Sequence, residues 1–162
     1  MSAHRLQLSI LREPSSNYNV TQIHTPAETV PIFFDEIGNR DRECICVMSL
    51  DNQMKVIGTE VAVIGAQNCA YVAPCDIFRV PVAVFATKVI LCHNHPSGDP
   101  FPSSDDCKIT TQLCAAGELL GIDVLDHIIL GWPEGKYTSM KDRGLIRNEG
   151  KLEIRWIDEK EN

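Results

Sequence analysis

The chain has 162 residues, of which 15 are Lys or Arg and 22 are Asp or Glu, giving a net charge of −7 at pH 7. A chain of this length buries roughly 70% of the surface that it exposes when unfolded, which is enough for one globular domain and too little for two large ones. No apolar run approaches the roughly 20 residues of a membrane helix, so an integral membrane protein is not expected. Because Lys and Arg are scattered and outnumbered by acidic residues, duplex nucleic acid is not expected as a partner either.

The cysteines and the first residues of the chain bear on its location. Seven cysteines with no C-x-x-C pair fit a reducing compartment. Residues 1–16 contain no apolar core of the length found in signal peptides. We therefore expect a cytoplasmic protein whose cysteines pack as small hydrophobic side chains, form no stable disulfides and bind no metal.

Three regions are predicted in chain order. An N-terminal arm, residues 1–24, shows an alternation over residues 5–13 that predicts an edge strand. Residues 25–146 should form the folded domain. A C-terminal extension, residues 147–162, alternates over residues 151–157 and is a candidate strand to pair with the arm.

Helix and strand signals alternate within the expected domain. Strands are predicted from alternating or continuous apolar runs at 43–50, 54–58, 89–92 and 122–130. Helices are predicted after the cap signal of Thr25 and Pro26, and at 76–88 and 103–120. Pro31 and Pro81 disturb the first two helices, since a proline inside a helix removes one hydrogen bond. This order predicts an α/β fold in which a mixed sheet has helices on both faces.

The residues that carry chemistry follow the apolar run at 89–92. His93 and His95 are two apart in an extended segment, so both should leave the strand end aimed at one point. Ser103 is a natural helix N-cap, and Asp106 then lies in the first turn, facing the strand end. Two imidazoles and one carboxylate are the open-sided ligand set of catalytic zinc. The alternative is that both histidines are ordinary loop residues and that Asp106 only complements the helix dipole.

The spacing H-x-H-x7-S-x2-D of these residues resembles the motif of the JAMM metalloprotease domain, also called MPN or JAB. Three segments, His93–Gly98, Pro102–Asp106 and Asp126–Ile129, resemble more narrowly the RadC-like branch of that family. The similarity spans about residues 26–146. It implies a mixed sheet in a three-layer α/β/α arrangement like that of cytidine deaminases. It also implies one zinc ion per chain, held by His93, His95 and Asp106.

The same resemblance implies an activity, the hydrolysis of a peptide, isopeptide or related amide bond by a zinc-bound water. Glu43 matches the upstream Glu of the motif and would accept the proton of that water, with Glu36 as its nearest competitor. Ser103 would help to stabilise the oxyanion, or would serve only as a helix cap. Asp126 and His127 are candidates to orient a ligating imidazole, or they simply line a neighbouring strand. The expected partners are a protein, a peptide or a small amide, and neither the substrate nor the oligomeric state is predicted.

The chain also departs from the RadC-like pattern. Cys75 stands where an Arg is usual and Pro81 is unusual, which weakens any expectation of an anionic substrate contact in that segment. No helix-hairpin-helix segment, which full-length RadC-like proteins carry, is expected, so a role in DNA repair gains no support.

Two other functions fit the sequence less well than hydrolysis. A zinc nucleobase deaminase needs H-x-E and P-C-x-x-C, and the second cysteine is missing after Cys75. An HNH nuclease needs a basic surface and three dispersed residues, whereas His93, Asn94 and His95 are adjacent. The alternatives that stay open are a non-catalytic protein-binding module of the same fold and an accessory protein in DNA metabolism.

Overall fold

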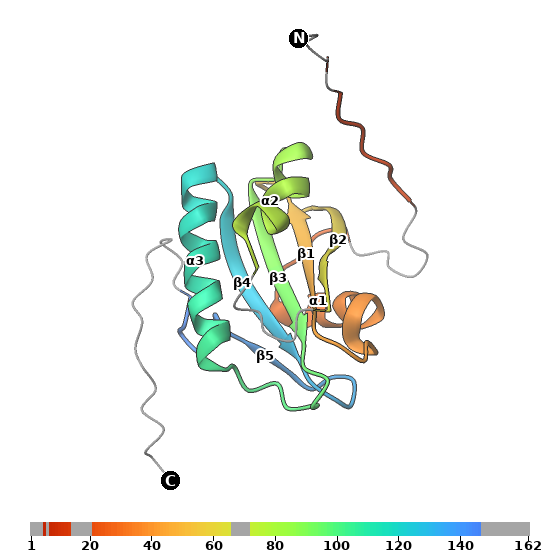
Figure 1. The fold of residues 1–162 in the computed structure, drawn as a ribbon, viewed down its shortest axis with the longest axis vertical. Coiled ribbons are helices and arrows are strands. Elements are labelled where there is room, and N and C mark those ends of the chain that lie inside the picture. Colours follow the sequence, from red (N-terminus) through yellow and green to blue (C-terminus); the bar gives the residue numbers. More distant parts are fainter. Residues whose placement is uncertain (1–4, 6, 14–20, 66–71, 147–162) are drawn as a thin grey trace, which may run out of the picture.

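The computed structural model describes residues 5, 7–13, 21–65 and 72–146. Two helical segments, α1 (Pro26–Phe33) and the π-helical turn η1 (Phe34–Gly38), precede the strands β1 (Cys44–Leu50) and β2 (Val56–Ile64). The remaining elements are α2 (Pro74–Ala83), β3 (Lys88–Asn94), α3 (Ser104–Leu120), β4 (Asp123–Leu130) and β5 (Tyr137–Ser139). The five strands form one sheet in the order β2-β1-β3-β4-β5 (Figure 1). β3 and β4 are parallel and the other neighbours are antiparallel, so the sheet is mixed as predicted.

Strand β1 lies between two hydrophobic layers, which explains its apolar residues on both faces. All of its seven residues are buried. Cys44, Cys46, Met48 and Leu50 pack with α1 and η1, whereas Ile45 and Val47 pack with α2 and α3. A strand covered on both sides has no solvent face and therefore reads as nearly continuous hydrophobicity. The helices of the two layers lie on opposite faces of the sheet, which confirms the predicted α/β fold.

Strand β3 is also covered on both faces, so each of its side chains points into one of the two hydrophobic layers. Cys92 packs in the layer with α1, while Leu91 packs in the layer with α2 and α3. Because side chains alternate along a strand, His93 points to the side of Leu91 and away from Cys92. Each cysteine in the described part of the chain is a free thiol.

The predicted edge strand at residues 5–13 is wrong for the part that the structure describes. Residues 5 and 7–13 form no strand and are exposed. Leu8 and Leu11 are 73% and 85% exposed, so the alternation has no sheet edge to pack on. The strand expected to pair with it, residues 151–157, lies outside the described residues.

Two elements end at other residues than predicted, and a third element was not predicted. β2 continues to Ile64 rather than ending at Gly58, because its whole length pairs with β1. α2 keeps Pro81 inside but ends at Ala83, five residues before the predicted end at Lys88, and Phe85 then takes a left-handed φ of 57°. β5 was not predicted because three residues are too short to show a periodic pattern.

The described residues contain no helix that is long and apolar enough to cross a membrane.

Candidate metal centre

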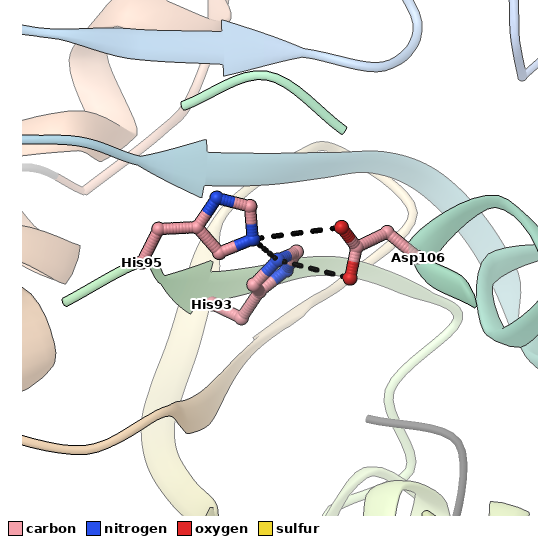
Figure 2. A group of neighbouring side chains, drawn as sticks. All are labelled: His93, His95 and Asp106. Carbon is pink, nitrogen blue, oxygen red and sulfur yellow. Dashed lines mark hydrogen bonds and ion pairs between the residues drawn. The ribbon is translucent and has the colours of Figure 1, made fainter. Parts of the chain in front are cut away.

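Three side chains, from the end of β3, the loop after it and the first turn of α3, converge on one point (Figure 2). The Nε2 atom of His93 lies 3.0 Å from Nε2 of His95 and 3.3 Å from Oδ1 of Asp106. Nε2 of His95 lies 3.5 Å from Oδ2 of Asp106. His93 and Asp106 are buried, whereas the side chain of His95 retains 14% of its exposure. The group is therefore enclosed by protein and reached by solvent at His95.

The topology of the sheet brings these residues together. In the register of the sheet, His93 lies opposite Ile45 of β1 and Ile129 of β4. Helix α3 connects the parallel strands β3 and β4, so its first turn begins beside the carboxyl end of β3. This is the place where α/β sheets usually hold their ligands. The predicted meeting of the two histidines with Asp106 is thus produced by one β-α-β connection.

The loop after β3 is hydrogen-bonded to the end of β4 and to the residues that follow it, and it holds His95 in place. The His95 N–H donates to the carbonyl of Leu130 at 2.9 Å, and Gly98 accepts from the N–H of Trp132. A Cβ on Gly131 would lie 2.6 Å from the carbonyl oxygen of Gly98, so only glycine allows the two loops to approach this closely. Nδ1 of His95 lies 2.6 Å from the carbonyl oxygen of Asp99. Since a carbonyl only accepts, Nδ1 carries the hydrogen and Nε2 presents its lone pair to the group.

The donor set and its spacing fit a metal ion. Three donors bound to one zinc ion in tetrahedral geometry at 2.0–2.1 Å lie about 3.3–3.4 Å apart. The two Nε2 atoms lie 3.0 Å apart, and each lies 3.3 or 3.5 Å from a different oxygen of Asp106, so the separations are close to that value. In the described part of the chain, His93, His95 and Asp106 form the one group of this kind.

The ionisation of Asp106 supports the same conclusion. Burial alone raises the pKa of a carboxyl group, but the adjoining imidazoles of His93 and His95 and the Ser103 hydroxyl outweigh burial and hold the pKa of Asp106 well below its usual range. Burial lowers the pKa of His95, yet the adjoining Asp106 carboxylate and the hydrogen bond to the Asp99 carbonyl raise it overall, with a smaller contribution from the charge of Glu43. The site therefore holds an anionic carboxylate in surroundings that favour a cation.

Glu43 lies on the same side of the sheet as the metal group. It immediately precedes β1, and its carbonyl accepts from the N–H of Gly65 at 2.9 Å. Alternation places its side chain on the face of Ile45, the residue opposite His93 in the sheet. Its charge is the smallest of the causes that raise the pKa of His95.

Glu36, the competitor of Glu43, lies on the opposite face. Its Oε1 accepts from the hydroxyl of Thr59 at 3.4 Å. Thr59 pairs with Met48, a residue of the layer that packs against α1 and η1. The sheet therefore separates Glu36 from the three converging side chains.

Ser103 forms a reciprocal cap with Asp106 at the start of α3. Its hydroxyl donates to Oδ2 of Asp106 at 2.7 Å and accepts from the Asp106 N–H at 3.1 Å. The Ser103 N–H donates to the same Oδ2 at 2.7 Å. The single hydroxyl hydrogen is thus directed at the carboxylate, and the oxyanion role of Ser103 stays a prediction.

The structure separates the two residues that were candidates to orient an imidazole. Nε2 of His127 lies 2.8 Å from Nδ1 of His93, whereas Asp126 accepts from the Ser139 hydroxyl at 2.5 Å and from two backbone N–H groups, one of them that of Lys141. Asp126 therefore holds the turn after β5, and only His127 touches a member of the metal group.

Asn94, between the two histidines, was not singled out from the sequence. Its Oδ1 accepts from the N–H of Cys44 at 2.8 Å, and its Nδ2 donates to the carbonyls of Arg40 and Arg42. These bonds fasten to β3 the segment that contains Glu43. Its partners lie 50 to 54 residues away, so no local pattern announces the contact.

The fold and the three-residue group define an α/β protein of the JAB/MPN class. Residues 23–145 match the family described as RadC-like JAB domain, and the chain belongs to this family.

Curated relatives agree with this assignment. The chain is 40% identical over 126 residues to a UPF0758 protein of Moorella thermoacetica, an alignment that covers 78% of this chain and 54% of the relative. The identity to a UPF0758 protein of Desulforamulus reducens is 41% over 124 residues, covering 76% and 54%. For a UPF0758 protein of Methanosarcina mazei it is 36% over 126 residues, covering 78% and 54%. The chain thus spans about half the length of these relatives.

Replacing Asn94 by Ala tests the fastening of the Glu43 segment. The variant leaves the buried Cys44 N–H without its acceptor, so we expect the free energy of unfolding to fall by about 1–3 kcal/mol. Asn39→Ala, on the exposed turn after η1, is the matched control and should change stability by less than about 0.5 kcal/mol. Urea unfolding followed by circular dichroism measures both, and equal stabilities for the two variants would contradict the assignment.

Replacing Ser103 by Ala tests the reciprocal cap. Loss of a Ser N-cap costs about 1 kcal/mol, within a range of about 0.5–2 kcal/mol, and Ser103→Ala should show this loss in thermal unfolding. Ser104→Ala replaces the exposed neighbour at the first helical position and should leave the melting temperature nearly unchanged. A Ser103 variant as stable as the Ser104 variant would show that the cap contributes nothing.

Proposed function

We propose that the protein is a zinc-dependent hydrolase that cleaves a peptide, isopeptide or related amide bond, with one zinc ion per chain held by His93, His95 and Asp106. The observation that carries the proposal is the convergence of these three donors at 3.0–3.5 Å on the side of the sheet where Glu43 lies. Structural zinc sites usually close with four protein ligands, whereas catalytic sites use three and keep one position open. The group found among the described residues contains three ligands and no thiolate.

Each residue has a defined task in this proposal. When bound here, zinc supplies a Lewis acid that polarises a carbonyl group and lowers the pKa of a coordinated water toward about 7. Glu43 accepts the proton of the attacking water and returns it to the leaving nitrogen. Ser103 holds the Asp106 carboxylate, and its hydroxyl reaches a substrate oxygen only by rotating away from Oδ2. Asn94 keeps the Glu43 segment against β3.

The substrate class follows from the chemistry alone. A protein, a peptide and a small amide all present the carbonyl and the leaving nitrogen that these groups require. We also propose that the protein is cytoplasmic, since the described cysteines are free thiols, as is usual in a reducing compartment.

Glu43→Gln separates a hydrolase from a binding module. The variant keeps the shape of the side chain but loses its basic oxygen, so zinc content should be unchanged while turnover falls by about 10²–10⁴-fold. Glu36→Gln, on the opposite face, is the matched control and should retain full turnover. The assay is a panel of fluorogenic peptide, isopeptide and small-amide substrates, with loss of activity on chelation and recovery on adding zinc.

Two outcomes would contradict this assignment. Unchanged turnover in Glu43→Gln would remove Glu43 as the base. A wild-type protein that binds one zinc ion but cleaves no member of the panel would favour the non-catalytic binding module.

A further inference from the structure

A chain of buried hydrogen bonds leads from the backbone of α3 to His93. Oγ1 of Thr110 lies 2.6 Å from the carbonyl oxygen of Asp106 and 2.6 Å from Nδ1 of His127. Nε2 of His127 in turn lies 2.8 Å from Nδ1 of His93. Thr110, His127 and His93 are each at most 1% exposed. No contact with solvent competes with these bonds, so each hydrogen must be placed by the groups themselves.

The carbonyl of Asp106 decides the direction of the chain. A carbonyl oxygen only accepts, and a threonine hydroxyl has one hydrogen. The Thr110 hydroxyl therefore donates to the carbonyl of Asp106 and must accept from His127. The second neighbour of the hydroxyl, Sδ of Met140 at 3.4 Å, is also an acceptor and leaves this direction unchanged. The opposite direction would place two oxygens 2.6 Å apart with no hydrogen between them.

The remaining hydrogens follow from the first one. His127 carries its hydrogen on Nδ1. Its ring is 1% exposed and its two nitrogens face the Thr110 hydroxyl and the His93 imidazole, so no carboxylate is hydrogen-bonded to the ring to balance a positive charge and the ring is neutral. A neutral imidazole has one N–H, so Nε2 of His127 is an acceptor and His93 must donate to it from Nδ1. Nε2 of His93 then presents a lone pair toward His95 and Asp106.

We infer that Thr110 and His127 are positioning residues that set the tautomer of His93 before the metal arrives. This inference deepens the proposed function and rests on the metal ligation proposed there. Without the chain, His93 would exchange between two tautomers, one of which places a hydrogen on the ligating nitrogen. Asp106 contributes twice, because its carboxylate is a ligand and its carbonyl begins the chain that orients another ligand. His95 is oriented separately, by the carbonyl of Asp99.

The helix itself supplies a matched pair of variants. Thr110 and Thr111 both donate to the carbonyl four residues earlier, Thr110 at 2.6 Å and Thr111 at 2.7 Å, but only Thr110 touches an imidazole. Both Thr110→Val and Thr111→Val remove one such bond with little change of shape. Thr110→Ser keeps the hydroxyl and serves as the conservative rescue.

Zinc affinity, measured by competition with a chromogenic chelator, is the first readout. Loss of a group that orients a metal ligand typically weakens metal binding by about 10–100-fold, and we expect a loss of that order for Thr110→Val. Thr111→Val and Thr110→Ser should stay within about threefold of the wild type, well below the loss typical of such a group. Affinities for Thr110→Val and Thr111→Val that agree within the same margin would overturn the inference.

The second readout needs no variant and no metal. Long-range ¹H–¹⁵N correlation spectra of the imidazoles in the metal-free wild-type protein report which nitrogen of His127 carries the hydrogen. The inference requires Nδ1, and a hydrogen on Nε2 would overturn it even if Thr110→Val failed to fold. A wild-type protein that shows the Nδ1 hydrogen but binds no zinc would instead refute the proposed function, so the two failures are distinguishable.

Discussion

Two imidazole nitrogens that lie 3.0 Å apart, each within 3.5 Å of one oxygen of a buried carboxylate, are the constraint on which the rest of this structure depends. Two lone pairs and a carboxylate oxygen repel one another unless a cation lies among them, and burial removes the water that would otherwise reduce the repulsion. Much of the surrounding structure keeps these atoms in place. Ser103 holds the carboxylate, Asp99 holds one imidazole and His127 holds the other.

The sheet holds these repelling groups together in a small domain. β3 is central and packed on both faces, so the backbone that carries His93 cannot relax away from the carboxylate. The parallel pairing of β3 with β4 places Ile129 opposite His93 and brings His127, on β4, within reach of the His93 imidazole. One β-α-β connection thus supplies a ligand strand, a ligand helix and a supporting strand. The same two-sided packing separates the face of Glu43 from the face of Glu36.

The parts that sequence reasoning predicted are those governed by local pattern. The spacing of His93, His95 and Asp106 is set by a strand end and the first turn of a helix, and the resemblance to the RadC-like motif rested on those residues. The central strands were predicted because both of their faces are apolar. The catalytic role of Glu43 stays a prediction, supported by its side of the sheet.

The parts that escaped prediction depend on contacts distant in the chain. Asn94 bonds a segment 50 residues earlier, and Thr110 acts through His127 on another strand. Thr110 lies four residues after Asp106 and so on the same face of α3, which the sequence alone could show. Its role depends on His127 of β4, and that contact could not be predicted from the sequence. The strand predicted at residues 5–13 was wrong because a local alternating pattern forms a strand only where it pairs with a sheet, and its described residues pair with none.

X-ray absorption at the zinc edge, combined with elemental analysis of protein expressed with added zinc, tests the central claim most directly. The account predicts one zinc ion per chain, two imidazole ligands and a first shell of nitrogen and oxygen alone at about 2.0–2.1 Å. A sulfur neighbour at about 2.3 Å, or a protein that contains no zinc, would contradict it.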